Sequence, residues 1–195
     1  MIKNRKRDLK TIGLLLAFYS VCTFGTFLCK YTYASSGHQE LVPSMINAII
    51  ADDVKGVEAL LKRGISVNAT SYRRSTFLML SSTTGNAQIV TILLSAGAKI
   101  NAKNLSGDTA LTEAVNLNHL NVVKILIQHG ADVNIQGENG TTPLMFVAYE
   151  GNIELIKALL LAKANRHITD KNGSTALKWA IQGNHTAAIQ MLQSH

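Results

Sequence analysis

Apolar positions recur along the chain at a fixed interval of 33 residues. The interval is plainest in one series of leucines: Leu60, Leu93, Leu126, Leu159 and Leu192. A threonine followed two positions later by leucine recurs in the same way, at Thr76, Thr109, Thr142 and Thr175. Apolar positions that repeat over such a period indicate stacked units and not one irregular core. The pattern predicts units at about 41–69, 70–102, 103–135, 136–168 and 169–195.

Each unit is predicted to contain two short helices joined by a turn. In the second unit, Thr76 can cap a helix that runs to about Thr84, and Gly85 ends it. A more apolar helix follows, and Gly97 suits the left-handed conformation that ends many helices. The start of this second helix recurs at Asp53, Asn86, His119, Asn152 and His185. Neither helix of a pair can bury its apolar side alone, so we expect neighbouring units to stack.

Several phrases in these units resemble those of ankyrin repeats. The resemblance is carried by Gly140-Thr-Thr-Pro-Leu144, Gly130-Ala-Asp-Val-Asn134, Gly97-Ala-Lys-Ile-Asn-Ala102 and Gly64-Ile-Ser-Val-Asn-Ala69. It implies an all-α repeat solenoid of about five stacked helix-turn-helix repeats with protruding β-turn fingers. This predicted ankyrin-repeat domain covers residues 41–195, and residues 35–40 are predicted to be a polar linker.

Some positions depart from the ankyrin pattern. The histidine of the family phrase is replaced by Met79, Thr112, Met145 and Lys178, so its usual hydrogen bonds between repeats are expected to be absent or altered. Arg74 and Lys163 stand where the other units have glycine. If the backbone keeps a positive φ there, each substitution costs roughly 1 kcal/mol. Departures of this kind are candidate functional positions, although drift is their commoner cause. The last helix carries Thr186, Gln190 and Gln193, which suits a solvent-facing end.

The net charge of +7 is unevenly distributed along the chain. Residues 1–34 hold six Lys/Arg and one Asp, whereas residues 35–195 hold 13 Lys/Arg and 11 Asp/Glu. The basicity therefore belongs mainly to the leader, and we expect no nucleic acid as a partner. Both cysteines, Cys22 and Cys29, also lie in the leader, so the repeats cannot form a disulfide.

The leader, residues 1–34, is predicted to be a signal peptide or an N-terminal membrane anchor with one hydrophobic helix. A cationic start precedes an uncharged apolar run at 11–29, which is long enough to span a bilayer and favours an anchor. The small residues Thr32 and Ala34 before Ser35 instead favour cleavage. Both outcomes stay open. Either places the repeats outside the cytoplasm: periplasmic or secreted if the leader is cleaved, membrane-anchored if it is not.

No catalytic, cofactor-binding or metal site is evident in the sequence. It has no Gly-rich phosphate loop and no paired-cysteine metal spacing, and its six histidines are scattered. Five Asn-x-Ser/Thr triplets are present, three of them in the predicted fingers, where glycans would cover the expected binding side. That favours export by a bacterium over export through an endoplasmic reticulum.

The ankyrin resemblance implies that a partner protein docks on the finger tips and on the exposed side of each first helix. It places these candidate partner-binding residues: Tyr72, Arg73, Leu105, Leu117, Glu138, Tyr149, Glu150 and Lys171. Tyr and Arg dominate many interfaces, which favours Tyr72, Arg73 and Tyr149. Trp179 is predicted to lie in the core between repeats four and five.

The predicted function is therefore a monomeric, non-enzymatic, exported adaptor or scaffold that binds another protein. Two alternatives remain: an enzyme whose site the repeat pattern hides, and a membrane-tethered structural spacer.

Overall fold

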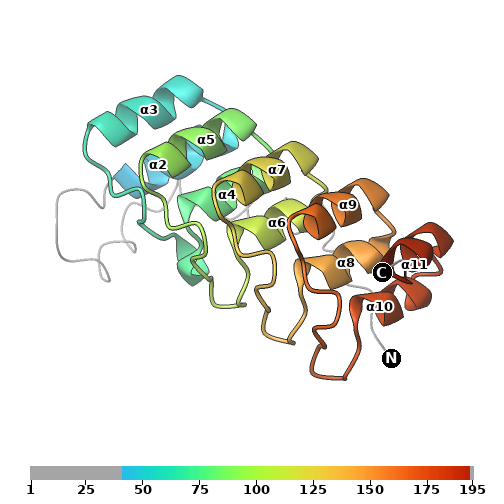
Figure 1. The fold of residues 1–195 in the computed structure, drawn as a ribbon. Coiled ribbons are helices and arrows are strands. Elements are labelled where there is room, and N and C mark those ends of the chain that lie inside the picture. Colours follow the sequence, from blue (N-terminus) through green and yellow to red (C-terminus); the bar gives the residue numbers. More distant parts are fainter. Residues whose placement is uncertain (1–40, 194–195) are drawn as a thin grey trace. The chain divides into compact units, whose positions relative to one another are not determined.

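Five helical hairpins stack side by side along residues 41–193, the part of the chain that this computed structural model describes (Figure 1). The first helices are α2 (Val42–Ile50), α4 (Phe77–Thr84), α6 (Ala110–Asn116), α8 (Pro143–Glu150) and α10 (Ala176–Gln182). The second helices are α3 (Val54–Lys62), α5 (Ala87–Ser95), α7 (Leu120–Gln128), α9 (Ile153–Leu161) and α11 (Thr186–Gln193). Each helix packs on its counterpart in the next hairpin, which gives two layers. The predicted all-α repeat solenoid is confirmed.

The predicted leader and linker lie outside the described residues. Among the helices within residues 41–193, none is both long enough and apolar enough to cross a membrane. That finding does not extend to the apolar run at 11–29, which lies outside the described residues.

The repeated threonine begins the first helix in three of the hairpins. Its side-chain oxygen accepts a hydrogen bond from the backbone of Met79, Thr112 or Met145, three positions later. The contact is reciprocal: the Thr112 hydroxyl accepts from the Thr109 backbone at 2.7 Å, and both methionine sulfurs accept from theirs at 3.4 Å. Three of the four residues that replace the family's histidine thus close a helix start locally, and the fourth, Lys178, does not, since Thr175 has no side-chain cap.

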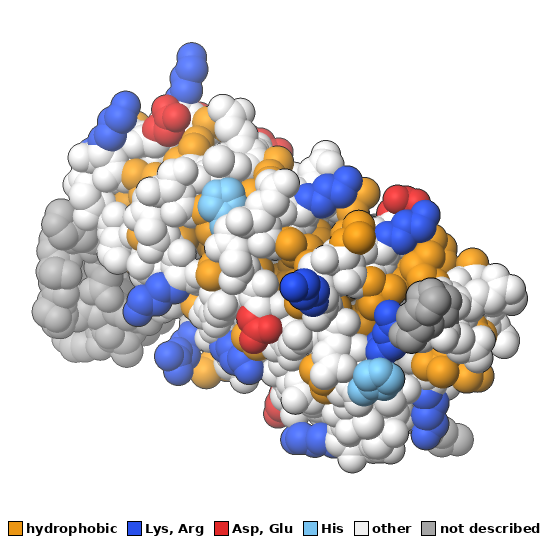
Figure 2. All heavy atoms as spheres, viewed as in Figure 1, with side chains coloured by type: hydrophobic (Ala, Val, Ile, Leu, Met, Phe, Trp, Pro, Cys, Tyr) orange, Lys and Arg blue, Asp and Glu red, His pale blue; other side chains and the backbone are white. Residues whose placement is uncertain are grey.

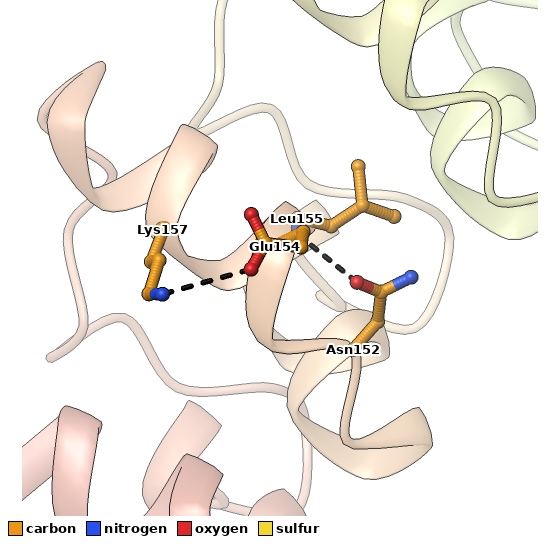
Figure 3. A network of polar contacts seen from close by, with 4 residues as sticks. All are labelled: Asn152, Glu154, Leu155 and Lys157. Atoms are coloured by element: carbon orange, nitrogen blue, oxygen red, sulfur yellow. Dashed lines mark hydrogen bonds and ion pairs between the residues drawn. The ribbon is translucent and has the colours of Figure 1, made fainter.

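The second helices begin at the predicted residues. Asp53, Asn86 and Asn152 each accept hydrogen bonds from the first turn of the helix that follows. The Asn152 side chain accepts from the Leu155 backbone N–H at 3.1 Å (Figure 3). The same view shows the ion pair between Glu154 and Lys157, whose charged atoms are 3.6 Å apart. Both side chains of that pair are exposed, so it adds little stability. His119 does not cap its helix, because its ring instead reaches the Thr83 carbonyl of the previous repeat at 3.1 Å.

The core lies between the two helix layers and runs unbroken through all five hairpins. All five leucines of the repeating series are buried in it. Full burial of one leucine side chain contributes about 1.5–3 kcal/mol, so the series stabilises every unit in the same way. At the last hairpin the pattern changes: Ile181 is 52% exposed, whereas its counterparts Val115 and Ala148 are completely buried. The last helix exposes Thr186, Gln190 and Gln193, as expected.

Both residues that replace a glycine of the repeat, Arg74 and Lys163, keep the left-handed backbone conformation. Arg74 has φ 60° and Lys163 has φ 63°, close to the glycines at the equivalent places in the other units. The expectation of strain at both is therefore confirmed. Arg73, next to Arg74, is also left-handed, with φ 63°.

Candidate protein-binding surface

Four fingers project from the row of first helices, and they line one side of the stack (Figure 1). We number them one to four: residues 70–75, 103–108, 136–141 and 169–174. Each is closed by an equivalent backbone hydrogen bond of 2.8–3.0 Å, for example from Ser71 to Ser75 and from Asp170 to Ser174. The four fingers therefore share one course, and their differences come from side chains and turn conformation.

Neighbouring fingers are bound to one another. The Leu105 backbone donates to the Arg73 carbonyl at 3.1 Å, and the Lys171 backbone donates to the Asn139 carbonyl at 3.1 Å. Side chains add links across the same 33-residue step: Lys103 reaches the Gln136 carbonyl at 3.0 Å, and Gln136 reaches that of Thr169 at 3.2 Å. The tips thus form a continuous strip whose members are fixed relative to each other.

The predicted finger residues all lie at this strip. Tyr72 is 86% exposed and Leu105 is 62% exposed, on the two fingers that the backbone bond from Leu105 to Arg73 joins. The Arg73 guanidinium of finger one donates to the Ser106 hydroxyl of finger two at 3.1 Å. Glu138 and Lys171 are exposed at the tips of fingers three and four.

The predicted helix residues are exposed on first helices. Leu117 follows α6, and Tyr149 and Glu150 form the last turn of α8. The structure also shows a column that the sequence reasoning missed. One residue in each of α4, α6, α8 and α10 lies half-buried at the same position: Leu80, Glu113, Phe146 and Trp179. The 33-residue interval that relates them was available in the sequence and could have identified the column. We call this column, the predicted helix residues and the finger tips the binding face.

Trp179 packs against the hydrophobic core but is only partly buried and lies at the binding face, so the prediction that it belongs to the core is confirmed only in part. Its ring meets the Tyr149 ring edge-on, with centroids 5.9 Å apart and planes at 80°, so it does contact repeat four as expected. Its indole N–H donates to the Asp170 carboxylate of finger four at 3.1 Å. That bond fixes the polar edge of the indole toward the finger, with the half-buried ring beside Tyr149.

Asp170 is the polar anchor of this end of the face. It is only 8% exposed, and its carboxylate also accepts from the backbones of Ser174 at 2.8 Å and Asn172 at 2.9 Å. Partial burial acts to raise the pKa of Asp170. The hydrogen bonds from Ser174, Asn172 and Trp179, with the nearby positive charge of Lys178, outweigh burial and hold its pKa below the usual value. Asp170 is therefore a structural carboxylate that fixes both the finger and the tryptophan.

The titratable side chains of the described residues do not form a metal site. Within 41–193, no three His, Cys, Asp or Glu side chains are close enough together to hold a metal ion. What the face offers instead is exposed tyrosine, leucine and arginine on a rigid framework, the residue types that suit contacts with another protein.

Stacked helical hairpins with a continuous strip of fingers define a repeat protein of the binding-scaffold class. A family model described as "Ankyrin repeats (3 copies)" matches residues 34–137 and again 132–195. The chain therefore belongs to the ankyrin-repeat family, whose members are in general protein–protein interaction modules and are typically not enzymes. A comparison with curated proteins gives no match.

Proposed function

We propose that this chain is an exported adaptor that binds another protein through the finger tips and the exposed side of its first helices. The observation that carries the proposal is the aromatic pair of Tyr149 and Trp179. Large aromatic side chains are costly to leave in water, and here two of them lie together, partly exposed, on the side that the fingers line.

The rigidity of the pair supports binding. Trp179 is held by Asp170, which is itself held by two backbone N–H groups of finger four. A side chain that is already fixed loses less conformational entropy when a partner covers it. Tyr and Trp are also the residues that most often dominate interface energy. Without chemistry of its own, the protein would act by tethering, stabilising or occluding its partner.

Capture of the partner in cells tests this proposal. The full-length chain is crosslinked in its native host and purified beside a variant with Tyr72→Ala, Arg73→Ala and Tyr149→Ala. A matched control carries Leu161→Ala, because Leu161 is 85% exposed on the second helix α9, away from the binding face. We expect one protein that the wild type and the control capture and that the triple variant loses.

Three other results would change this proposal, the first in the place of the interface and the other two in the adaptor function itself. Equal capture by all three proteins would move the interface off the binding face. Specific capture by none of them, with folded protein present, would favour a structural spacer. Turnover of a substrate by the purified chain, lost on changing one polar residue, would favour a hidden enzyme.

Export rests on the composition of the leader: a cationic start, an apolar run at 11–29 and small residues before Ser35. Protease added to intact cells or spheroplasts should digest the repeats, and the mass of the mature chain decides between cleavage and anchoring. Protection of the repeats from protease until the membrane is lysed would contradict export.

A further inference from the structure

Finger one differs from the other three in the conformation of its tip. Tyr72–Arg74 forms a short 3-10 turn in which Arg73 and Arg74 are both left-handed, with φ 63° and 60°. The other fingers have glycine at the place of Arg74: Gly107, Gly140 and Gly173, with φ 69–76°. A left-handed residue with a side chain costs free energy that glycine does not. Finger one therefore keeps a strained arginine where three related turns avoid the strain, and observed strain of this kind is a pointer to function.

Positive charge gathers on fingers one and two. Arg73, Arg74 and Lys103 are all exposed, and none of them pairs with a carboxylate among residues 41–193. Arg73 and Lys103 donate instead to uncharged oxygens of the next finger. Figure 2 shows blue side chains along the lower left edge, where these fingers project.

The charge changes sign along the strip. Fingers one and two hold three cations and one acid, Asp108, for a net charge of +2. Fingers three and four hold Glu138, Asp170 and Lys171, for a net charge of −1. Exposed apolar surface accompanies the cations, because Tyr72 and Leu105 lie at the same two tips. The first two fingers thus offer a small surface that is both basic and apolar.

We propose that residues 72–74 of finger one and 103–105 of finger two bind an acidic segment of the partner protein. This inference rests on the proposed function and specifies the chemistry of the partner at one end of the binding face. The forked guanidinium groups of Arg73 and Arg74 suit Asp or Glu carboxylates. Tyr72 and Leu105 take apolar side chains next to the acids. Arg73 is already held by Ser106, so less of its freedom is lost on binding.

A nucleic acid fits this surface less well than an acidic peptide. A phosphodiester chain that followed the binding face beyond the first two fingers would meet Glu113, Glu138 and Glu150. Those carboxylates repel a continuous polyanion. A peptide can carry its acids at one end alone.

The test is a selection of random 12-residue displayed peptides on the full-length chain, followed by affinity measurement with the synthetic peptides that bind. We expect the bound peptides to be enriched in Asp and Glu beside apolar residues. Arg73→Gln combined with Arg74→Gly should weaken their binding about tenfold or more, and added salt should weaken wild-type binding.

The single substitution Arg74→Gly tests whether Arg74 contributes to binding or is a neutral replacement of glycine. It should raise the melting temperature, because it removes the left-handed side chain, and yet lower the affinity for the acidic peptides. Lys163→Gly is the matched control: it relieves the same backbone strain in the loop after α9, so it should raise the melting temperature and leave affinity unchanged.

The outcomes distinguish this inference from the function on which it rests. Bound peptides without acidic enrichment, lost on Tyr149→Ala but insensitive to the arginine variants, would overturn the inference and leave the protein-binding function standing. Bound peptides insensitive to both sets of variants would overturn both. A single-stranded oligothymidine that binds more tightly than the peptides at physiological salt would also overturn the inference, in favour of a polyanion site.

Discussion

Fingers one and three follow the same course and close with an equivalent hydrogen bond, yet they have different residues at the left-handed position of the turn. At the third position of the tip, finger three has Gly140 with φ 75°, and finger one has Arg74 with φ 60°. A Cβ on Gly140 would lie 3.1 Å from the backbone nitrogen of Lys171, because finger four packs closely there. Arg74 is exposed, and its side chain makes no hydrogen bond or ion pair within the described residues. Fingers one and three thus share one left-handed backbone conformation and an equivalent 3.1 Å bond to the next finger, and they differ in whether that position carries a side chain.

The largest effect should come from adding a side chain to finger three. Gly140→Ala combines a left-handed alanine with a tight Cβ contact, 3.1 Å from the Lys171 backbone nitrogen of finger four. We expect it to lower the free energy of unfolding by about 2–3 kcal/mol, measured by urea denaturation. Gly173→Ala is the control, since a Cβ there meets nothing within 4 Å, and it should cost only about 1 kcal/mol. Equal losses in the two variants would show that finger packing plays no part.

The second comparison sets the anchor of finger four against its counterpart in finger one. At equivalent positions, Asp170 accepts three hydrogen bonds, whereas the Ser71 hydroxyl donates one to the Ser75 carbonyl at 3.2 Å. Asp170→Asn removes the charge and turns one acceptor into a donor, so we expect a loss of about 1–2 kcal/mol at neutral pH by urea denaturation. Ser71→Ala, with its weaker contact, should cost less.

Lowering the pH should reduce the difference in unfolding free energy between the wild type and Asp170→Asn. Because the pKa of Asp170 is lowered in the folded state, its charged form stabilises the fold fully above about pH 4, the unfolded value. That contribution is lost as the pH falls through the lower folded pKa. A gap in unfolding free energy that stays constant from neutral pH into acid would contradict the role given to Asp170.

The smallest effect is expected from relieving the strain. Lys163→Gly and Arg74→Gly should each raise the free energy of unfolding by about 0.5–1 kcal/mol, since the left-handed cost exceeds the entropy that glycine loses on folding. The melting temperature should rise by about 2 °C in each, measured by calorimetry. A loss of stability in Arg74→Gly alone would show that the arginine side chain stabilises finger one.

The sequence carried most of the fold, because a period of 33 residues places equivalent apolar residues in equivalent environments. The capping threonines, the glycine-terminated helices and the buried leucines all lie where the period predicts. The resemblance to a known family supplied the fingers, whose course the period alone does not define.

The binding face was only partly predictable. Exposure of Tyr72, Leu105 and Tyr149 followed from their place in the repeat. Trp179 was placed too deep because a large aromatic residue beside Ala180 suggested the core, and the hydrogen bond that its indole N–H donates to Asp170 joins residues of different elements. The left-handed conformation of Arg73 was also missed, because no other finger has a glycine at that position to signal a positive φ.

Trp179 is the chain's one tryptophan, and it is half-exposed on the binding face with its N–H tied to a carboxylate. Its fluorescence therefore comes from that face alone. A partner that covers the indole should shift the emission toward shorter wavelength, and loss of the bond to Asp170 should change it without any partner. Intrinsic tryptophan fluorescence can therefore report the binding of a partner to this face without an attached label.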